Sequence, residues 1–80
     1  MVVYVTRYCG YCHLAEGLLQ RKGMPYRKVD VTNDPEARGW LRQATGQRTV
    51  PQIFIGRRSI GGFQELYAMV RKGELDRLPG

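Results

Sequence analysis

The sequence predicts a small α/β domain in which a four-stranded mixed sheet is flanked by three helices. Three observations lead to this prediction. Short runs rich in Val and Ile alternate with longer segments whose apolar residues recur at helical spacing. Glycine and proline stand at the expected boundaries between these segments. The 80-residue chain has room for one domain only, which we place over residues 1–80.

The first strand and the first helix are predicted at the start of the chain. Residues 2–6 form an uninterrupted β-branched and apolar run, which is typical of a strand covered on both faces. From Tyr11 to Lys22 the apolar side chains fall at helical spacing, and we expect a helix there. Gly23 stands where helices commonly end in a left-handed residue, and Pro25 prevents continuation.

A second strand and a second helix follow. Residues 26–31 alternate between charged and apolar side chains and predict the strand. Asp34 and Pro35 predict the start of the helix, with a capping side chain followed by proline in the first turn, and Gly46 predicts its end. The apolar side of this helix comprises Ala37, Trp40, Leu41 and Ala44.

The last part of the chain predicts a hairpin and a helix. Residues 52–55 predict a strand, Gly56-Arg57 a tight loop, and residues 58–60 the returning strand. Gly61-Gly62 breaks the pattern before a helix that ends at Gly73. We expect its inward side to comprise Leu66, Tyr67, Met69 and Val70, and we expect Leu75 and Leu78 of the tail to pack back onto the domain.

The predicted element order is therefore β-α-β-α-β-β-α. Because a helix joins the first two strands, they should be parallel with a right-handed crossover. The last two strands should form an antiparallel hairpin.

The charge pattern and the search for targeting segments limit the functions that we expect. The net charge is +6, from 13 Lys and Arg against 7 Asp and Glu. The basic residues are spread along the chain, and basic and aromatic residues are not interleaved on one element. We interpret the charge as a solvated surface or an attraction for a small anionic substrate, without nucleic-acid binding. No segment resembles an export signal or is long enough to span a membrane, so we expect a cytoplasmic protein without membrane contact.

Both cysteines, Cys9 and Cys12, stand at the junction of the first strand and the first helix. A disulfide between them would close too small a loop to stabilise the fold, so the pair indicates redox chemistry or metal binding. If Cys9 is the N-cap, its sulfur faces the free N–H groups of Tyr11 and Cys12, which favour thiolate over thiol. Cys12 lies one turn inside the helix without such donors. We therefore expect Cys9 to be the attacking nucleophile and Cys12 the resolving thiol.

Two other kinds of site share this motif. The spacing Cys9-x-x-Cys12-His13 matches a c-type haem attachment site, but the missing export signal and the preceding strand argue against haem. A zinc site needs four ligands, whereas the chain offers two cysteines and one adjacent histidine. We expect no metal within the monomer and a surface position for His13.

Three segments together resemble a glutaredoxin. They are Cys9-Gly10-Tyr11-Cys12, the run Thr-Val-Pro-Gln-Ile-Phe-Ile over residues 49–55, and Gly61-Gly62 before the last helix. The resemblance, to the small bacterial dithiol type, extends over nearly the whole chain. It implies the thioredoxin-like fold and a glutathione-dependent thiol–disulfide oxidoreductase that reduces protein–glutathione mixed disulfides and disulfides. The implied partners are glutathione, as co-substrate, and glutathionylated or disulfide-containing proteins, and we expect a monomer.

The resemblance also implies which residues bind glutathione. Cys9 takes the glutathionyl group, and the backbone of Val50 pairs with the cysteinyl part of glutathione like an added strand. The Val50-Pro51 bond is expected to be cis. The resemblance matches Arg38 to the glycine carboxylate, and the N–H groups at the start of the last helix to the γ-glutamyl carboxylate. The predicted glutathione-binding residues are Tyr11, Arg38, Thr49, Val50, Pro51, Gly62, Phe63 and Gln64.

Two positions depart from the family pattern. Gly10 stands where many glutaredoxins have proline, and Thr6 stands where many have lysine or arginine. Some members with a small residue in place of that proline bind a [2Fe–2S] cluster between two monomers, through the first cysteine of each monomer and two glutathiones. The alternative hypothesis is therefore a cluster-binding or carrier protein in which Cys9 is the cluster ligand.

Overall fold

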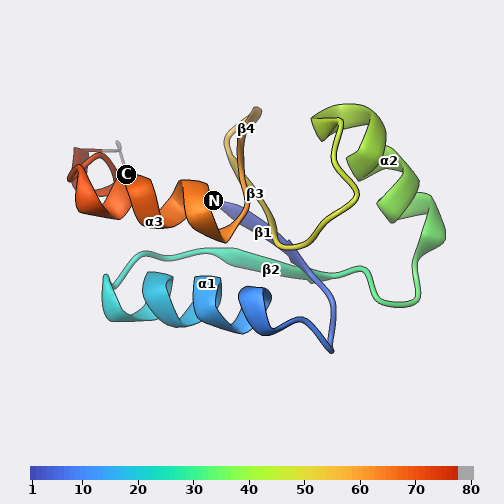
Figure 1. Cartoon of the computed structure of the whole chain (residues 1–80), viewed down its shortest axis with the longest axis horizontal. Helices are drawn as coiled ribbons and strands as arrows, with labels where there is room; N and C mark the ends of the chain where they lie inside the picture. The colour runs from blue at the N-terminus through green and yellow to red at the C-terminus, as the bar shows by residue number, and fades with distance from the viewer. Residues whose placement is uncertain (78–80) are drawn as a thin grey trace.

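A computed structural model describes residues 1–77 and contains the predicted elements in the predicted order (Figure 1). The strands form one sheet in the order β2-β1-β3-β4. β1 is parallel to β2 and antiparallel to β3, and β3 is antiparallel to β4. The elements are β1 (Val2–Val5), α1 (Gly10–Arg21), β2 (Arg27–Asp30), α2 (Pro35–Thr45), β3 (Gln52–Ile55), β4 (Arg58–Gly61) and α3 (Phe63–Arg71), followed by a short 3₁₀ turn, η1 (Leu75–Arg77).

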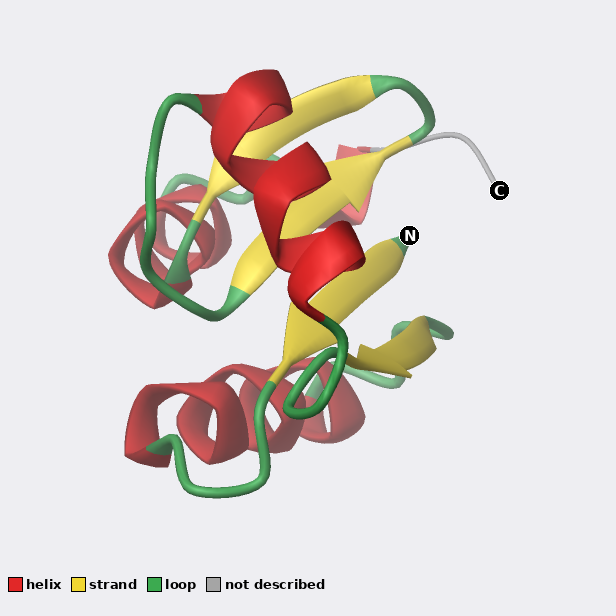
Figure 2. Ribbon diagram, turned by 90° about the vertical axis from the view of Figure 1, so that its right-hand side faces the viewer, coloured by secondary structure: helices red, strands yellow, loops and turns green. Residues whose placement is uncertain are grey.

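The helices cover both faces of the sheet. Figure 2 shows α2 in front of the sheet, with α1 and α3 behind it. Val3 and Val5 of β1 point to the face covered by α1 and α3, whereas Tyr4 points to the α2 face. β1 is therefore covered on both sides, as its apolar run predicts. None of the helices in residues 1–77 is long and apolar enough to cross a membrane.

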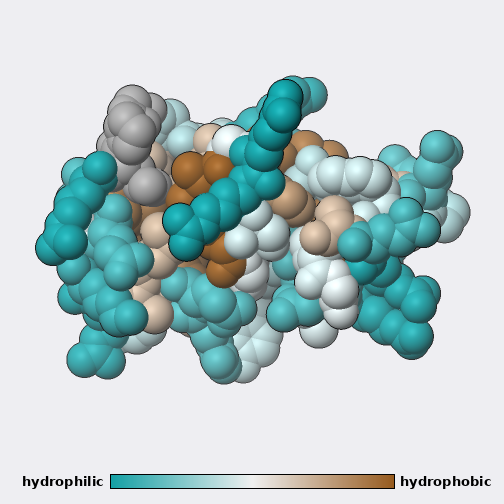
Figure 3. All heavy atoms as spheres, turned by 90° about the horizontal axis from the view of Figure 1, so that it is seen from above, coloured by the Kyte–Doolittle hydropathy of each residue, from teal (hydrophilic) through white to brown (hydrophobic). Residues whose placement is uncertain are grey.

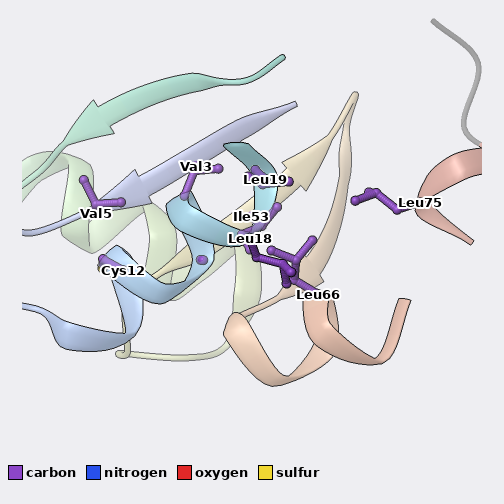
Figure 4. Packing of buried hydrophobic residues seen from close by; sticks show 9 residues of the cluster. Val3, Val5, Cys12, Leu18, Leu19, Ile53, Leu66 and Leu75 are labelled. Atoms are coloured by element: carbon purple, nitrogen blue, oxygen red, sulfur yellow. The ribbon is translucent and has the colours of Figure 1, made fainter. Parts of the chain in front are cut away.

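The larger core lies between the sheet and the pair α1 and α3. In Figure 4 the side chains of Leu18, Ile53 and Leu66 point toward one another from α1, β3 and α3. Leu75, from the turn after α3, completes this core at 1% exposure, and Cys12 belongs to it. The prediction for Leu75 is thus confirmed, and Leu78 lies outside the described residues. A smaller cluster on the α2 face comprises Val31, Leu41 and Phe54.

The helix ends follow the predicted local chemistry. Asp34 caps α2, because its Oδ1 accepts a hydrogen bond from Ala37 N at 3.0 Å. Gly23 after α1 and Gly46 after α2 have φ angles of +65° and +71°, which glycine adopts without steric cost. The signals read from Asp, Pro and Gly therefore placed both helices to within a residue or so.

Three side chains on the predicted apolar side of α2 or the predicted inward side of α3 are not buried. Trp40 is 49% exposed, Tyr67 is 47% exposed, and Ala44 is exposed. The two aromatic side chains pack by their ring faces at the surface. Trp40 lies 5.7 Å from Phe54 between ring centroids, and Tyr67 lies 5.9 Å from Phe63. Within residues 1–77 nothing covers the outer sides of α2 and α3, so only the centre of each apolar stripe is buried.

Candidate active site

Cys9 is the N-cap of α1, as predicted. Its φ and ψ of −109° and 110° are extended, and its Sγ accepts a hydrogen bond from Cys12 N at 3.2 Å. On its other side Sγ donates to the carbonyl oxygen of Val50 at 3.4 Å. The Cys12 N–H is available to both thiol and thiolate, whereas the Val50 carbonyl accepts only from the thiol. The Cys9 sulfur therefore lies between the start of α1 and the segment before β3.

Cys12 differs from Cys9 in its environment. It is 1% exposed within the larger core, whereas Cys9 is partly exposed, and both are free thiols. Burial, reinforced by the hydrogen bond with Cys9, raises the pKa of Cys12 to about 12. The negative charge of Glu16, one turn further along α1, acts in the same direction. Cys12 is therefore a protonated thiol at neutral pH, which suits a resolving thiol and not the first nucleophile.

Selective alkylation tests this inequality. At pH 7.5 iodoacetamide should modify Cys9, and the alkylation rate of Cys12 should be at least about 100-fold lower, because only the thiolate form of a cysteine reacts. As the pH rises toward 12, Cys12 should deprotonate and its rate should increase. Mass spectrometry of digested samples gives both rates, and protein unfolded in urea should show two reactive thiols. Equal rates for the two cysteines in the folded protein at pH 7.5 would contradict the assignment.

Arg7, close to Cys9 in sequence, is engaged elsewhere. Its Nε lies 3.6 Å from Asp30 Oδ2, and its backbone N donates to Thr32 Oγ1 at 2.9 Å. Hydrogen bonds from Thr32, with a smaller contribution from the Arg7 charge, lower the pKa of Asp30. Arg7 thus joins the ends of β1 and β2. His13 is exposed, as expected.

A groove of about 570 Å³ lies beside the Cys9 thiol and brings most of the predicted binding residues together. It runs between the start of α1, the segment before β3 and the start of α3. The Val50-Pro51 bond is cis, as the resemblance implies. Seven of the eight predicted residues line the groove: Tyr11, Thr49, Val50, Pro51, Gly62, Phe63 and Gln64. Three further lining residues, Gln47, Arg48 and Glu65, were not predicted.

The double glycine allows the chain to approach itself closely at one end of the groove. Gly61 has a φ of +102°, and a Cβ there would overlap the Glu65 side chain. A Cβ on Gly62 would come 3.2 Å from the carbonyl oxygen of Pro51. Glu65 Oε1 accepts a hydrogen bond from Gly62 N at 3.0 Å and so caps α3. The sequence signal for this cap is a glutamate, Glu65, three residues after the N-cap residue Gly62.

Gln52 supports another wall of the groove. Its side chain is fully buried, and Nε2 donates to Gln47 Oε1 at 3.0 Å and to the carbonyl oxygen of Thr49 at 2.8 Å. The Gln52 Oε1 has no hydrogen-bond partner within the described residues. This side chain fastens the segment 47–49, which has no regular secondary structure, to the sheet.

Arg38, the eighth predicted residue, does not line the groove. It lines an adjoining cavity of about 300 Å³. The groove and this cavity share Gln47, Arg48, Thr49 and Val50. Arg42 also lines the cavity, so three arginines meet there. The basic residues are therefore not all dispersed, because Arg38 and Arg42 are four residues apart on α2 and the loop after α2 adds Arg48.

No group of three or more His, Cys, Asp or Glu side chains within residues 1–77 is arranged to hold a metal ion. The site instead offers an accessible sulfur at a helix start, a buried thiol one turn away and a groove beside them. On a four-stranded thioredoxin-like fold, this arrangement defines a thiol–disulfide oxidoreductase.

The chain belongs to the glutaredoxin family. The Glutaredoxin family model matches residues 1–60. The chain is 44% identical to a glutaredoxin of Pseudomonas aeruginosa, over 98% of this chain and 93% of that protein. It is 38% identical to Glutaredoxin 3 of Escherichia coli K12, over 95% of this chain and 92% of that protein. The prediction of a glutaredoxin-type oxidoreductase is thereby confirmed.

Solved structures agree with this assignment. The crystal structure of a buckwheat glutaredoxin–glutathione complex superposes with a TM-score of 0.89 at 35% identity, covering 95% of this chain and 72% of that one. The solution structure of glutaredoxin from Brucella melitensis gives a TM-score of 0.86 at 40% identity, covering 96% of this chain and 84% of that one. The predicted thioredoxin-like fold is confirmed.

Proposed function

We propose that the protein reduces mixed disulfides between glutathione and proteins, with glutathione as the electron donor. The observation that carries the proposal is the groove that begins beside the Cys9 thiol and contains seven of the eight residues expected to bind glutathione. The buckwheat relative, whose structure holds glutathione, supports the same ligand.

The proposed reaction proceeds in two exchanges. The Cys9 thiolate attacks the glutathione sulfur of the mixed disulfide. A Cys9–glutathione disulfide forms, and the protein thiolate leaves and takes up a proton. The thiolate of a second glutathione then attacks the glutathionyl sulfur, which releases oxidised glutathione and regenerates the Cys9 thiolate. For protein disulfides, Cys12 supplies the second thiol after losing its proton, and the Cys9–Cys12 disulfide is later reduced by glutathione.

Two ends of the groove match the two carboxylates of glutathione. The first N–H groups of a helix have no acceptor within the helix, and Glu65 occupies only that of Gly62. The N–H groups of Phe63 and Gln64 are therefore left for the γ-glutamyl carboxylate. At the other end Arg38 lines the adjoining cavity, and we assign the glycine carboxylate to it. Between them, Val50 is the residue proposed to pair with the cysteinyl backbone.

A substrate comparison tests this function. The mixed disulfide of glutathione with 2-mercaptoethanol should be reduced with glutathione as donor. The corresponding mixed disulfide of cysteinylglycine, which lacks the γ-glutamyl group, should react at least about 10-fold more slowly in kcat/KM, because the contacts at the start of α3 are lost. Equal rates for the two substrates would contradict glutathione recognition while leaving the thiol chemistry intact.

The cluster-binding alternative rests on Gly10 alone, and the comparisons do not favour it, so we propose the reductase. We also propose that the protein acts in the cytoplasm, as a monomer, on glutathionylated or disulfide-containing proteins. The reducing conditions of that compartment keep a partly exposed thiol such as Cys9 in its reduced form.

A further inference from the structure

Three arginines surround the cavity that adjoins the groove. Arg38 and Arg42 lie one turn apart on α2, and Arg48 enters from the loop before β3. The cavity has a volume of about 300 Å³, and none of the Asp and Glu side chains in residues 1–77 lines it. Figure 3 shows that hydrophilic side chains dominate the end of the molecule formed by α2, at the right of the view.

None of the three arginines is neutralised by an ion pair within residues 1–77. The ion pairs in this part of the chain join Arg7 to Asp30, Lys22 to Asp76 and Lys28 to Glu16. Asp34, at the start of α2, accepts from a backbone N–H as the helix cap. Like charges gathered around one cavity repel each other unless an anion from outside the chain joins them.

Glutathione accounts for only part of this charge. This step rests on the proposed function, which assigns the glycine carboxylate, one negative charge, to the Arg38 end of the groove. Arg42 and Arg48 then remain without an anion. The cavity shares Val50 with the groove, and the carbonyl oxygen of Val50 lies 3.4 Å from Cys9 Sγ. A second anion bound there would therefore belong to a group held close to the reacting disulfide.

We propose that this cavity binds an Asp or Glu side chain of the protein substrate, a few residues from the glutathionylated cysteine. An extended chain advances roughly 3.3–3.6 Å per residue, so a side chain two to four residues from the substrate cysteine can reach roughly 7–14 Å from the disulfide. Guanidinium groups bind carboxylates through paired N–H donors, which makes arginine well suited to this contact. The protein is then selective for glutathionylated cysteines that have acidic neighbours.

The test compares two glutathionylated peptides that differ only in having Asp and Glu, or Asn and Gln, around the cysteine. We expect the acidic peptide to have a kcat/KM about 3- to 10-fold higher at low salt, and the ratio to approach one at about 0.5 M salt. Arg42→Gln should remove most of this preference. Arg42→Lys, which keeps the charge, should retain part of it. Arg21→Gln, which changes an exposed arginine at the end of α1, is the matched control and should leave the ratio unchanged.

The mixed disulfide of glutathione with 2-mercaptoethanol separates the two hypotheses. Normal turnover of that compound with equal rates for the two peptides would overturn the acidic-substrate proposal alone. If neither peptide nor the 2-mercaptoethanol compound is reduced, the proposed function is overturned. A salt-sensitive preference that persists unchanged in Arg42→Gln and is lost in Arg21→Gln would assign the effect to another part of the surface and so refute this cavity as its source.

Discussion

Replacing Cys9 by serine is expected to lower the reduction of glutathione mixed disulfides by about 10³-fold or more, because the serine hydroxyl is not ionised at neutral pH and cannot attack sulfur. Replacing Cys12 by serine should leave this activity within about threefold of the unchanged protein, because a second glutathione resolves the Cys9–glutathione disulfide. The two single substitutions should therefore differ by orders of magnitude, although the cysteines are three residues apart.

The structure gives the physical reason for this difference. Cys9 is partly exposed at the start of α1, and its Sγ bonds to Val50, a residue that lines the groove, so that a disulfide in the groove can approach it. Cys12 is 1% exposed, and its raised pKa keeps it protonated at neutral pH. An incoming disulfide therefore meets Cys9 first.

A protein disulfide serves as the matched second substrate. Its reduction should be lost in both variants, because the dithiol route needs Cys12 to release the protein from Cys9. The rate of glutathione oxidation, measured for each of the two variants with each of the two substrates, gives the four activities to be compared. Activity on the glutathione mixed disulfide that survives in Cys9→Ser and disappears in Cys12→Ser would reverse the two roles.

Local patterns were sufficient to predict the elements and the thiol pair. Asp34-Pro35, Gly23 and Gly46 each act on neighbouring backbone, so the sequence around them determines the helix ends. The same holds for Cys9, whose hydrogen bond with Cys12 N spans three residues. Such contacts do not depend on how distant segments pack.

The unpredicted features depend on tertiary packing. Arg7 is two residues from Cys9 in the sequence, but the parallel pairing of β1 with β2 brings its side chain to Asp30. Arg48 joins Arg38 and Arg42 only because the segment before β3 runs past α2. The exposure of Tyr67 likewise depends on what covers α3, which periodicity alone does not specify.

The second large effect concerns Leu66, the only fully buried residue of α3. Replacing it by alanine should lower the free energy of unfolding by about 2–5 kcal/mol, from lost burial and the cavity left behind. A domain of 80 residues has a total stability of only about 4–12 kcal/mol. Leu66→Ala should therefore shift the urea midpoint strongly. Leu14→Ala is the matched control, because Leu14 is 51% exposed on α1, and its change should be within about 0.5 kcal/mol.

This substitution also tests how the groove is held. Phe63 and Gln64 line the groove from the first turn of α3, and Leu66 packs that helix against α1 and β3 (Figure 4). Under conditions where Leu66→Ala remains folded, KM for the glutathione mixed disulfide should rise, because the start of α3 is less firmly positioned. The alkylation rate of Cys9 should change little, since its cap contacts lie within α1. Equal urea midpoints for Leu66→Ala and Leu14→Ala would show that α3 is held by contacts other than Leu66.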